Sequence, residues 1–409
     1  MRNKCRSIGM MVICAVLICV GRTAAQDWPQ WRGVNRDGKV TGFTAPKTWP
    51  EALKKKWTAK VGLGDATPVL MGNRLFVFAR RDADEVALCL DADSGRQLWE
   101  VKYPAQAVTG PAHSHAGPRS SPAVAGGKVV TVGVGGVVSC LDAATGKLAW
   151  RKDPFPKVVP TFFAASSPII LDGMAVAQVG GKDKGAIIAY DLATGDEKWR
   201  CAGVPTAYAS PVLMTVDGSK QLVTLSDKGV VGIGPADGKI LWKIPFASKS
   251  MSPNSATPIV DGQTVIFTGP GRGIKAAKIE KQADGFTPKE LWSNEKASTV
   301  FNTPVLKDGL LFGLSQRNNI FCLDAETGKA AWTDTAKNGR AFGAVVDVGS
   351  AILALPNSSE LIAFKPSGKQ YAELARFKVA DTPTYAHPVI AGNRIFVKDQ
   401  EAVTLWTFE

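Results

Sequence analysis

Three histidines are the side chains in this chain best suited to metal chemistry. His113 and His115 stand one residue apart, and His387 lies near the C-terminus. A His-x-His pair can bind a transition metal through its imidazole nitrogens. No carboxylate stands beside any of the three in the sequence, so they can equally be polar loop residues. Metal binding at His113, His115 and His387 and a simple loop role therefore both stay open.

Six further polar or aromatic side chains occupy comparable positions, each shortly before an apolar strand. They are Arg119, Tyr208, Asn254, Asn302, Arg340 and Tyr385. If the loops that carry them converge on one face, these groups form a concave binding site. Otherwise they hydrogen-bond to loop backbone and fill a channel. We assign none of them a catalytic or cofactor-binding role.

The sequence offers no assignable residues for phosphate binding, nucleophilic catalysis or glycoside hydrolysis. The Gly-rich stretches 133–136 and 269–273 could be mistaken for phosphate cradles, but neither opens a helix and both fall where strands turn. No nucleophile elbow accompanies the histidines. Paired carboxylates for glycoside hydrolysis cannot be assigned, because the candidates are explained as turn residues. These candidates are Asp91, Asp142, Asp191 and Asp324.

The elements that must position these residues repeat eight times. Each repeat opens with small residues, in most cases followed by proline, and successive openings lie roughly 40–55 residues apart, the length of one propeller blade. The openings are at Thr67-Pro68, Ser121-Pro122, Ser167-Pro168, Ser210-Pro211, Thr257-Pro258, Thr303-Pro304, Gly343-Ala344 and His387-Pro388. Gly- and Asp-containing turns separate the strands. The chain is therefore predicted to be all-β, an eight-bladed β-propeller of four-stranded antiparallel blades with very little helix.

Each repeat also closes on an aromatic residue. Trp57, Trp99, Trp150, Trp199, Trp242, Trp292 and Trp332 are in phase, and Phe377 stands where the next tryptophan would be. Trp57 precedes the first opening, and the last repeat has no closing tryptophan. We therefore expect residues 54–60 to supply the outer strand of the last blade, which closes the ring without an unpaired sheet edge. Trp28 has no repeat partner, and we expect it to contribute less stability than Trp150.

Composition and charge are those of an exported chain. A basic start, an apolar stretch and a small-residue cleavage site make residues 1–25 a predicted signal peptide. Residues 26–53 form an N-terminal segment, and 54–409 form the propeller. The mature chain carries net charge +9, because the removed residues include four basic groups and no acidic one. This excess is spread out, apart from the run 54–56, and there is no basic-aromatic stripe for nucleic acid. The mature chain has no apolar stretch long enough to span a membrane.

The four cysteines of the mature chain are predicted to be buried packing residues. Cys89, Cys140 and Cys322 each precede Leu-Asp at the same place in three different repeats, and Cys201 has no partner in phase. Equivalent positions on separate blades of a ring are too far apart to form a disulfide.

The turn that ends each repeat is specific enough to suggest a family. In residues 140–150, a small residue opens an eleven-residue stretch, Gly146 is seventh and Trp150 is last. This resembles the tryptophan-docking motif of the quinoprotein-like, or PQQ-like, β-propellers, in which the indole stacks between neighbouring blades. The same spacing recurs at Gly95/Trp99, Gly195/Trp199, Gly238/Trp242 and Gly328/Trp332. The blade ending at Trp292 has a longer turn, and the blade of Phe377 has lost the motif. Residues 27–33 are similar to a segment near the start of many exported members.

The resemblance implies two classes of function. The family contains quinone- and calcium-dependent dehydrogenases and non-catalytic BamB-like exported members. The dehydrogenases carry adjacent cysteines and a calcium-binding Glu, Asn and Asp, and we can place neither set in this chain. We therefore expect an exported, periplasmic or extracellular, non-catalytic scaffold without a cofactor, monomeric within any complex and bound to a protein partner in the cell envelope. The alternatives are a reduced PQQ-dependent dehydrogenase, which would bind PQQ with calcium, and a polysaccharide- or metal-binding sensor.

Overall fold

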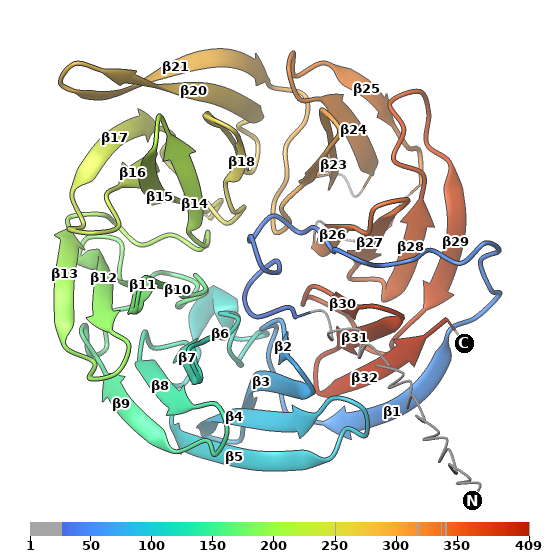
Figure 1. Ribbon diagram of the computed structural model, residues 1–409, viewed down its shortest axis with the longest axis horizontal. Coiled ribbons are helices and arrows are strands. Elements are labelled where there is room, and N and C mark those ends of the chain that lie inside the picture. Colours follow the sequence, from blue (N-terminus) through green and yellow to red (C-terminus); the bar gives the residue numbers. More distant parts are fainter. Residues whose placement is uncertain (1–26, 250, 317–318, 337, 340–341, 409) are drawn as a thin grey trace, which may run out of the picture.

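Eight four-stranded antiparallel sheets stand around a central axis in the computed structural model (Figure 1). It describes residues 27–249, 251–316, 319–336, 338–339 and 342–408. The signal peptide predicted at 1–25 and the candidate Arg340 lie outside the described residues. The predicted all-β, eight-bladed propeller is confirmed. The described helical structure is a single 3₁₀ turn, η1 (Gly110–Ala112).

Each blade runs from an inner strand at the axis to an outer strand at the rim. The strands of blades 1 to 4 are β2 (Val69–Met71), β3 (Arg74–Arg81), β4 (Asp84–Asp91) and β5 (Gln97–Pro104); β6 (Ala123–Ala125), β7 (Lys128–Val132), β8 (Val138–Asp142) and β9 (Leu148–Lys152); β10 (Ile169–Leu171), β11 (Met174–Gly180), β12 (Gly185–Asp191) and β13 (Glu197–Ala202); and β14 (Val212–Val216), β15 (Ser219–Leu225), β16 (Gly229–Ile233) and β17 (Ile240–Pro245).

Blades 5 to 8 follow the same order. Their strands are β18 (Ile259–Asp261), β19 (Thr264–Thr268), β20 (Ile274–Gln282) and β21 (Gly285–Asn294); β22 (Val305–Lys307), β23 (Leu310–Leu314), β24 (Ile320–Asp324) and β25 (Ala330–Thr333); β26 (Gly343–Asp347), β27 (Ile352–Pro356), β28 (Glu360–Phe364) and β29 (Glu373–Lys378); and β30 (Val389–Ala391), β31 (Arg394–Lys398), β32 (Ala402–Thr407) and β1 (Lys54–Lys60).

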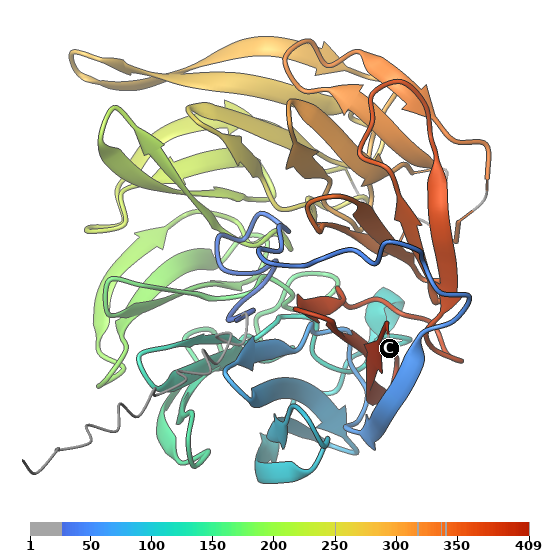
Figure 2. The ribbon, with the colours of Figure 1, turned by 45° about the vertical axis from the view of Figure 1, so that its right-hand side comes forward.

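The ring closes through the pairing of the two ends of the chain. β1 runs antiparallel to β32, with Lys54 opposite Thr407 and Lys60 opposite Ala402. Blade 8 thus takes three strands from the C-terminal end and its outer strand from the N-terminal end, as the sequence predicts. Figure 2 shows this blue outer strand beside the red C-terminal strands. The lysines at 54–56 lie exposed on this edge strand, where they discourage pairing with another sheet.

In blades 1, 2, 3 and 6, an aspartate builds the turn before the outer strand. In blade 2, the carboxylate of Asp142 accepts hydrogen bonds from the backbone N–H groups of Ala144 and Thr145 and from the Thr145 hydroxyl. These bonds, those from Thr145 first, lower the pKa of Asp142. Gly146 follows with φ +76°, a conformation that glycine adopts without a Cβ penalty. In these four blades the turn combines Asp, Ser or Thr, and Gly at this spacing, whereas blade 4 has Gly234 in place of the aspartate.

The glycine of this turn also makes room for a tryptophan from the preceding blade. An ideal Cβ on Gly195 would lie 2.6 Å from the indole of Trp150, and one on Gly95 would lie 2.7 Å from that of Trp57. Each indole N–H donates to a backbone carbonyl of the same turn, as from Trp150 to Leu192 at 3.0 Å. Trp99, Trp199 and Trp292 lie on Gly146, Gly238 and Gly328 in the same way.

Blade 5 departs from this pattern. It lacks a glycine in phase, and its last two strands, β20 and β21, form a long hairpin that contacts β17 of blade 4. Ile279 and Phe286 of the hairpin pack in the cluster that contains Trp242. The Trp242 indole N–H donates instead to the side chain of Gln221 in its own blade, at 2.6 Å. The hairpin therefore replaces the usual docking turn as the cover over Trp242.

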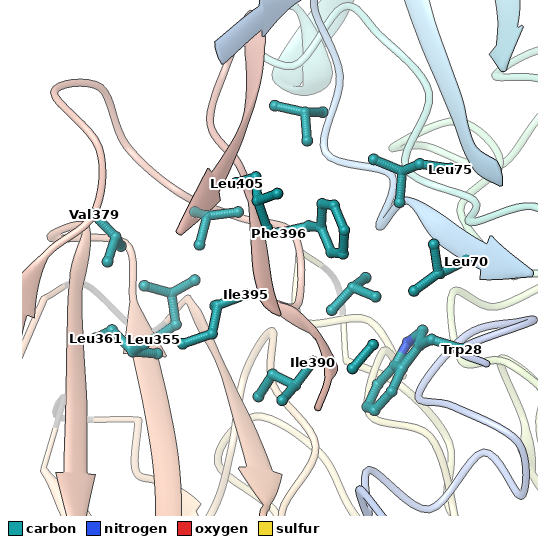
Figure 3. Packing of buried hydrophobic residues seen from close by; sticks show 14 of the residues in the cluster. Trp28, Leu70, Leu75, Leu355, Leu361, Val379, Ile390, Ile395, Phe396 and Leu405 are labelled. Atoms are coloured by element: carbon teal, nitrogen blue, oxygen red, sulfur yellow. The ribbon is translucent and has the colours of Figure 1, made fainter. Parts of the chain in front are cut away.

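The largest hydrophobic cluster lies where the ring closes, across blades 7, 8 and 1 (Figure 3). Trp28 belongs to it and pairs with β2 through mutual backbone hydrogen bonds with Leu70 at 2.8 and 2.9 Å. The side chain of Trp28 is 2% exposed, against 7% for Trp150. Trp28 is therefore a core residue although its segment does not repeat, and its burial is a reason to expect a stability contribution similar to that of Trp150.

The four cysteines at 89, 140, 201 and 322 are free and buried, as predicted. Burial raises the pKa of the Cys140 thiol to about 11, which keeps it protonated and unreactive. Among the residues that the structure describes, no helix is long and apolar enough to cross a bilayer.

Candidate functional site

The linkers between blades gather on one face of the propeller. Antiparallel strands alternate in direction, so the linkers and the turns between second and third strands share one end of every blade. The longest linkers are 105–122 and 153–168. They pack on each other through Val108, Ala112 and Phe163, over the buried Val134 of blade 2. These two long linkers build up one side of this face. The whole face that carries the linkers is called the linker face.

The N-terminal segment fills the channel behind the linker face, where Figure 1 shows it as the blue chain crossing the centre of the ring. After Trp28, the carbonyl of Pro29 accepts from Val124 N in β6, and residues 38–40 bond Asp347 in β26. Two buried arginines tie the segment to the inner ends of the blades. Arg36 donates to the carbonyls of residues 167 and 168, and Arg32 to those of 303 and 304. The sequence predicted this segment as a separate unit but not its place in the channel.

A cavity of about 410 Å³ opens on the linker face. All eight linkers contribute to its wall, and Trp31 of the N-terminal segment closes its inner end. The described residues that line it are Trp31, Asp65, Pro111, Ala112, Ser114, His115, Arg119, Phe162, Ala165, Ser167, Tyr208, Ser210, Pro253, Ser255, Phe301, Asn302, Thr303, Phe342, Gly343, Tyr385 and His387. A concave site of this size, with mixed apolar and polar groups, can hold a small molecule or one end of a larger ligand.

Hydroxyl groups at the strand openings join one blade to the next around this cavity. Ser121 N donates to the Ser167 hydroxyl, and Ser167 N donates to the Ser210 hydroxyl, both at 2.9 Å. The same bond runs from Thr257 N to Thr303 and from His387 N to Thr67, also at 2.9 Å. The small hydroxyl residue that opens most repeats is therefore a link between blades, which also fixes the position of the cavity wall.

Asp65 and His115 form the most polar contact in the wall. His115 Nδ1 lies 2.6 Å from Asp65 Oδ2. Gly117 lets their two linkers touch, because a Cβ there would lie 2.2 Å from the carbonyl oxygen of Leu63. The buried Lys398 ammonium holds the same linker through the Gly64 carbonyl at 2.6 Å. No carboxylate stands beside His115 in the sequence. In the structure, the carboxylate of Asp65, fifty residues earlier in the chain, contacts it.

Aromatic rings form the wall on the side of blades 6, 7 and 8. Phe301 stacks on Phe342 with ring centroids 4.4 Å apart, and the His115 ring also stacks on Phe342, at 5.9 Å. Tyr385 stands edge-on to Phe342 at 5.2 Å and to His115 at 4.8 Å. Phe301 is 38% exposed, so the stack extends to the rim of the cavity.

The opposite wall carries Arg119 and Tyr208. Arg119 donates to the carbonyls of Phe162 and His115, and burial lowers its pKa. The phenol oxygen of Tyr208 accepts from Phe162 N at 3.0 Å, and burial raises the pKa of Tyr208 to about 12. The phenol is therefore protonated at neutral pH and retains a hydrogen to donate.

His387 lies deeper, at the inner end of the cavity. It is 2% exposed, and its ring meets the edge of Trp31 at a centroid distance of 4.6 Å. Burial, followed by the charge of Arg32, lowers the pKa of His387 well below its ordinary value of 6.5. The imidazole is therefore neutral at neutral pH, and its Nδ1 has no hydrogen-bond partner among the described residues.

The structure brings together some of the sequence-derived candidates and separates others. His115, Arg119, Tyr208, Asn302, Tyr385 and His387 line the cavity. His113 is exposed at the end of η1 and is not among the lining residues. Asn254 is buried and bonds the backbone carbonyls of Ser226 and Phe246, and Asn302 bonds that of Leu314. These two amides hold loops in place.

Five of the cavity residues that were not predicted from the sequence carry an aromatic ring or a carboxylate. They are Trp31, Asp65, Phe162, Phe301 and Phe342, although Asp65 and Phe301 stand two residues before an opening, as Arg119, Tyr208 and Tyr385 do. Phe301 and Phe162 stand in linkers two and five residues before an opening. An aromatic residue inside a linker is the signal that would have found both.

The described residues contain no group of three or more His, Cys, Asp or Glu side chains arranged to hold a metal ion. His115 is engaged by Asp65, and its neighbour in the His-x-His pair stands outside the cavity. The two imidazoles therefore do not converge on one point in the cavity.

Comparison with known proteins identifies the family. A sequence profile described as outer membrane protein assembly factor BamB matches residues 36–116 and 112–334. The chain belongs to this family. Outer membrane protein assembly factor BamB of Burkholderia pseudomallei is 24% identical over 362 residues, 85% of this chain and 86% of that protein. The Yersinia pestis protein of the same name is 25% identical over 263 residues, 60% of this chain and 63% of that protein.

Dehydrogenases share the same fold. A quinohemoprotein alcohol dehydrogenase of Pseudomonas putida is 31% identical over 158 residues, 36% of this chain and 21% of that protein. Among solved structures, BamB of Moraxella catarrhalis superposes with a TM-score of 0.65 at 14% identity, covering 88% of this chain and 98% of its own. The quinohemoprotein alcohol dehydrogenase of Comamonas testosteroni gives 0.68 at 15% identity, covering 95% and 81%. These likenesses show the fold.

Proposed function

We propose that this protein is an exported, non-catalytic scaffold of the cell envelope that binds a protein partner on its linker face. The observation that carries the proposal is the cavity on that face, where aromatic and polar side chains from all eight linkers meet. Loops on a rigid scaffold are the usual place for binding residues. The relatives named as outer membrane protein assembly factors support a role in an assembly.

The cavity residues do not fit the calcium-bound quinone of the dehydrogenases. Calcium takes six to eight oxygen ligands, usually with several carboxylates. Asp65 is the only carboxylate among the described lining residues, and His115 already bonds its Oδ2. The four cysteines are buried at separate places in blades 1, 2, 3 and 6. The dehydrogenase alternative therefore lacks a site in the described part of this chain.

Site-specific photocrosslinking in envelopes of the source cell tests the scaffold proposal. A photoreactive residue replaces Phe301, which is 38% exposed at the rim of the cavity. The matched control replaces Asp261, the exposed last residue of β18, which leads into the turn on the opposite face. We expect a protein adduct from position 301 and none from position 261. Equal adducts at both positions, or none at 301, would contradict binding on the linker face.

A reconstitution assay tests the enzymatic alternative directly. The purified protein is incubated with calcium and pyrroloquinoline quinone, and reduction of an artificial electron acceptor is followed with alcohols and sugars. We expect no reduction above the rate without protein. Turnover that depends on the quinone and the protein would refute the scaffold proposal.

A further inference from the structure

Arg119 lines the cavity, and Arg32 and Arg36 bond the backbone carbonyls of the lining residues Thr303 and Ser167. All three guanidinium groups donate to carbonyl oxygens, and none donates to a carboxylate among the described residues. Arg32 and Arg36, which are 1% and 2% exposed, donate to the backbone carbonyls at two strand openings. Arg119, in the wall itself, donates to the carbonyls of Phe162 and His115. A buried charge is costly unless an opposite charge matches it. Asp65, which bonds His115, is the one carboxylate among the described lining residues and offsets part of the charge of Arg119. The remaining positive charge is available for a ligand to match.

The two inner arginines retain their charge at neutral pH. Burial lowers the pKa of Arg32 to about 10 and that of Arg36 to about 9, both still above neutrality. Their backbones adopt φ of 60° and 59°, a strained conformation for residues with a Cβ that tends to cluster at functional sites. The Nε atom of each is buried without a hydrogen-bond partner among the described residues.

Hydrogen-bond donors face the cavity from the linkers that lead into blades 2, 3 and 4. The hydroxyls of Ser167 and Ser210 accept from backbone N–H groups, so each keeps its hydrogen for another partner. Tyr208 also accepts, from Phe162 N, and stays protonated. Together with Arg119, these three hydroxyls make this wall a set of hydrogen-bond donors. Arg36 places a further positive charge behind the wall, because it donates to the Ser167 carbonyl. Donors backed by positive charge select an anion.

The linkers into blades 6, 7 and 8 offer ring surfaces instead. Phe301, Phe342 and Tyr385 line this wall in mutual contact, and Trp31 closes the inner end. The sides of the cavity therefore differ in kind. One side suits a negatively charged group, and the other suits a flat apolar ring at stacking distance.

We propose that the cavity binds a small organic acid, with its carboxylate against Arg119 and the hydroxyls of Ser167, Ser210 and Tyr208, and its ring against Phe301 and Phe342. This inference rests on the proposed function only in placing ligand binding on the linker face. A ring carrying a carboxylate occurs both in aromatic acids and in the uronic acids of polysaccharides, which also stack on aromatic side chains. The shared chemistry is the carboxylate next to an apolar ring face.

Calorimetric titration of the unmodified protein tests the charge requirement without any substitution. Indole-3-acetate represents the aromatic acids, digalacturonate the uronic acids, and indole-3-acetamide is the neutral match of the first. We expect at least one of the two acids to bind. If indole-3-acetate binds, it should bind at least tenfold more tightly than indole-3-acetamide. Binding by digalacturonate alone would assign the ligand to polysaccharide. Binding of neither acid at millimolar concentration, or equal binding of acid and amide, would overturn the proposal.

Two arginine variants locate the binding. Arg119→Gln removes the charge in the wall and should weaken binding of the acid at least tenfold. Arg272→Gln is the matched control, because Arg272 lies on the same face, is half-buried and donates to the carbonyls of Phe246 and Ala247, but does not line the cavity. Equal affinities in the two variants would overturn the placement. If Arg119→Gln does not fold, the comparison of acid with amide on the unmodified protein decides.

The outcome is separable from that of the scaffold proposal. A protein adduct at position 301 together with no binding of either acid would remove only this inference. Binding of an acid without any adduct at position 301 would remove only the proposal of a protein partner.

Discussion

Replacement of Gly195 by alanine should reveal how much the docking tryptophans contribute to the ring. Gly195 has φ +77°, and an added Cβ would lie 2.6 Å from Cγ of Trp150. The left-handed backbone costs alanine about 1–2 kcal/mol, and displacement of the packed indole adds about 1–3 kcal/mol. We therefore expect Gly195→Ala to lower the free energy of unfolding by about 2–5 kcal/mol.

Gly173 supplies the matched control for this substitution. It has nearly the same backbone conformation, with φ +74°, but an added Cβ would meet no atom within 4 Å. Gly173→Ala should therefore lose only the backbone contribution, about 1–2 kcal/mol. Urea titrations of both variants, compared at equal slope, give the difference. Equal losses in the two variants would mean that the contact between indole and glycine does not hold neighbouring blades together.

Three further predictions concern closure, core and pH. A truncated chain beginning at Gly64 lacks β1 and the N-terminal segment with the buried Trp28, and should lose cooperative unfolding. An unchanged urea midpoint would contradict the shared blade. Trp150→Ala and Trp28→Ala should each lower the free energy of unfolding by about 3–5 kcal/mol. Leu148 is exposed on the same strand as Trp150, so Leu148→Ala should change it by no more than about 0.5 kcal/mol. Similar losses in all three variants would refute the burial argument. The pKa of His387 is lowered in the folded state. Below pH 6.5 the unfolded chain therefore binds a proton at this residue that the folded chain does not bind. The free energy of unfolding consequently falls as the pH is lowered below 6.5, by at most about 1.4 kcal/mol per pH unit from this residue. His387→Gln should flatten this slope, and parallel pH profiles for the two proteins would argue against a neutral, buried imidazole.

The blade architecture could be predicted because its signals are local and repeated. The turn around Asp142 needs a carboxylate, a hydroxyl and a glycine within five residues, and such short-range chemistry is legible in a sequence. The pairing of β1 with β32 could also be predicted. Trp57 stands in phase before the first repeat, and the last repeat lacks its outer strand, so the segment around Trp57 had to supply that strand. Two blades lack the repeated turn: in blade 5 a long hairpin packs with Trp242 instead, and blade 7 ends on Phe377 without the motif.

The site was predictable only in part. Residues at a constant offset before each strand opening, such as Arg119, Tyr208 and Tyr385, were placed on one face by the repeat itself, and they line the cavity. Asn254, three residues before its opening instead of two, was selected with them, but it bonds buried backbone. Offset from a repeat gives the face on which a residue lies, but not whether its side chain turns toward the axis or into a loop.

The sequence by itself thus determined the number of blades, the order of strands and the manner of closure, because each depends on periodicity and on turns of a few residues. Only the tertiary structure decided that Asp65 meets His115, that Phe301, Phe342 and Tyr385 form one wall, and that the N-terminal segment closes the channel with Trp31. These contacts join linkers that do not repeat and lie tens to hundreds of residues apart. They follow from where the closed ring brings the linkers together, a constraint that no local pattern of residues expresses.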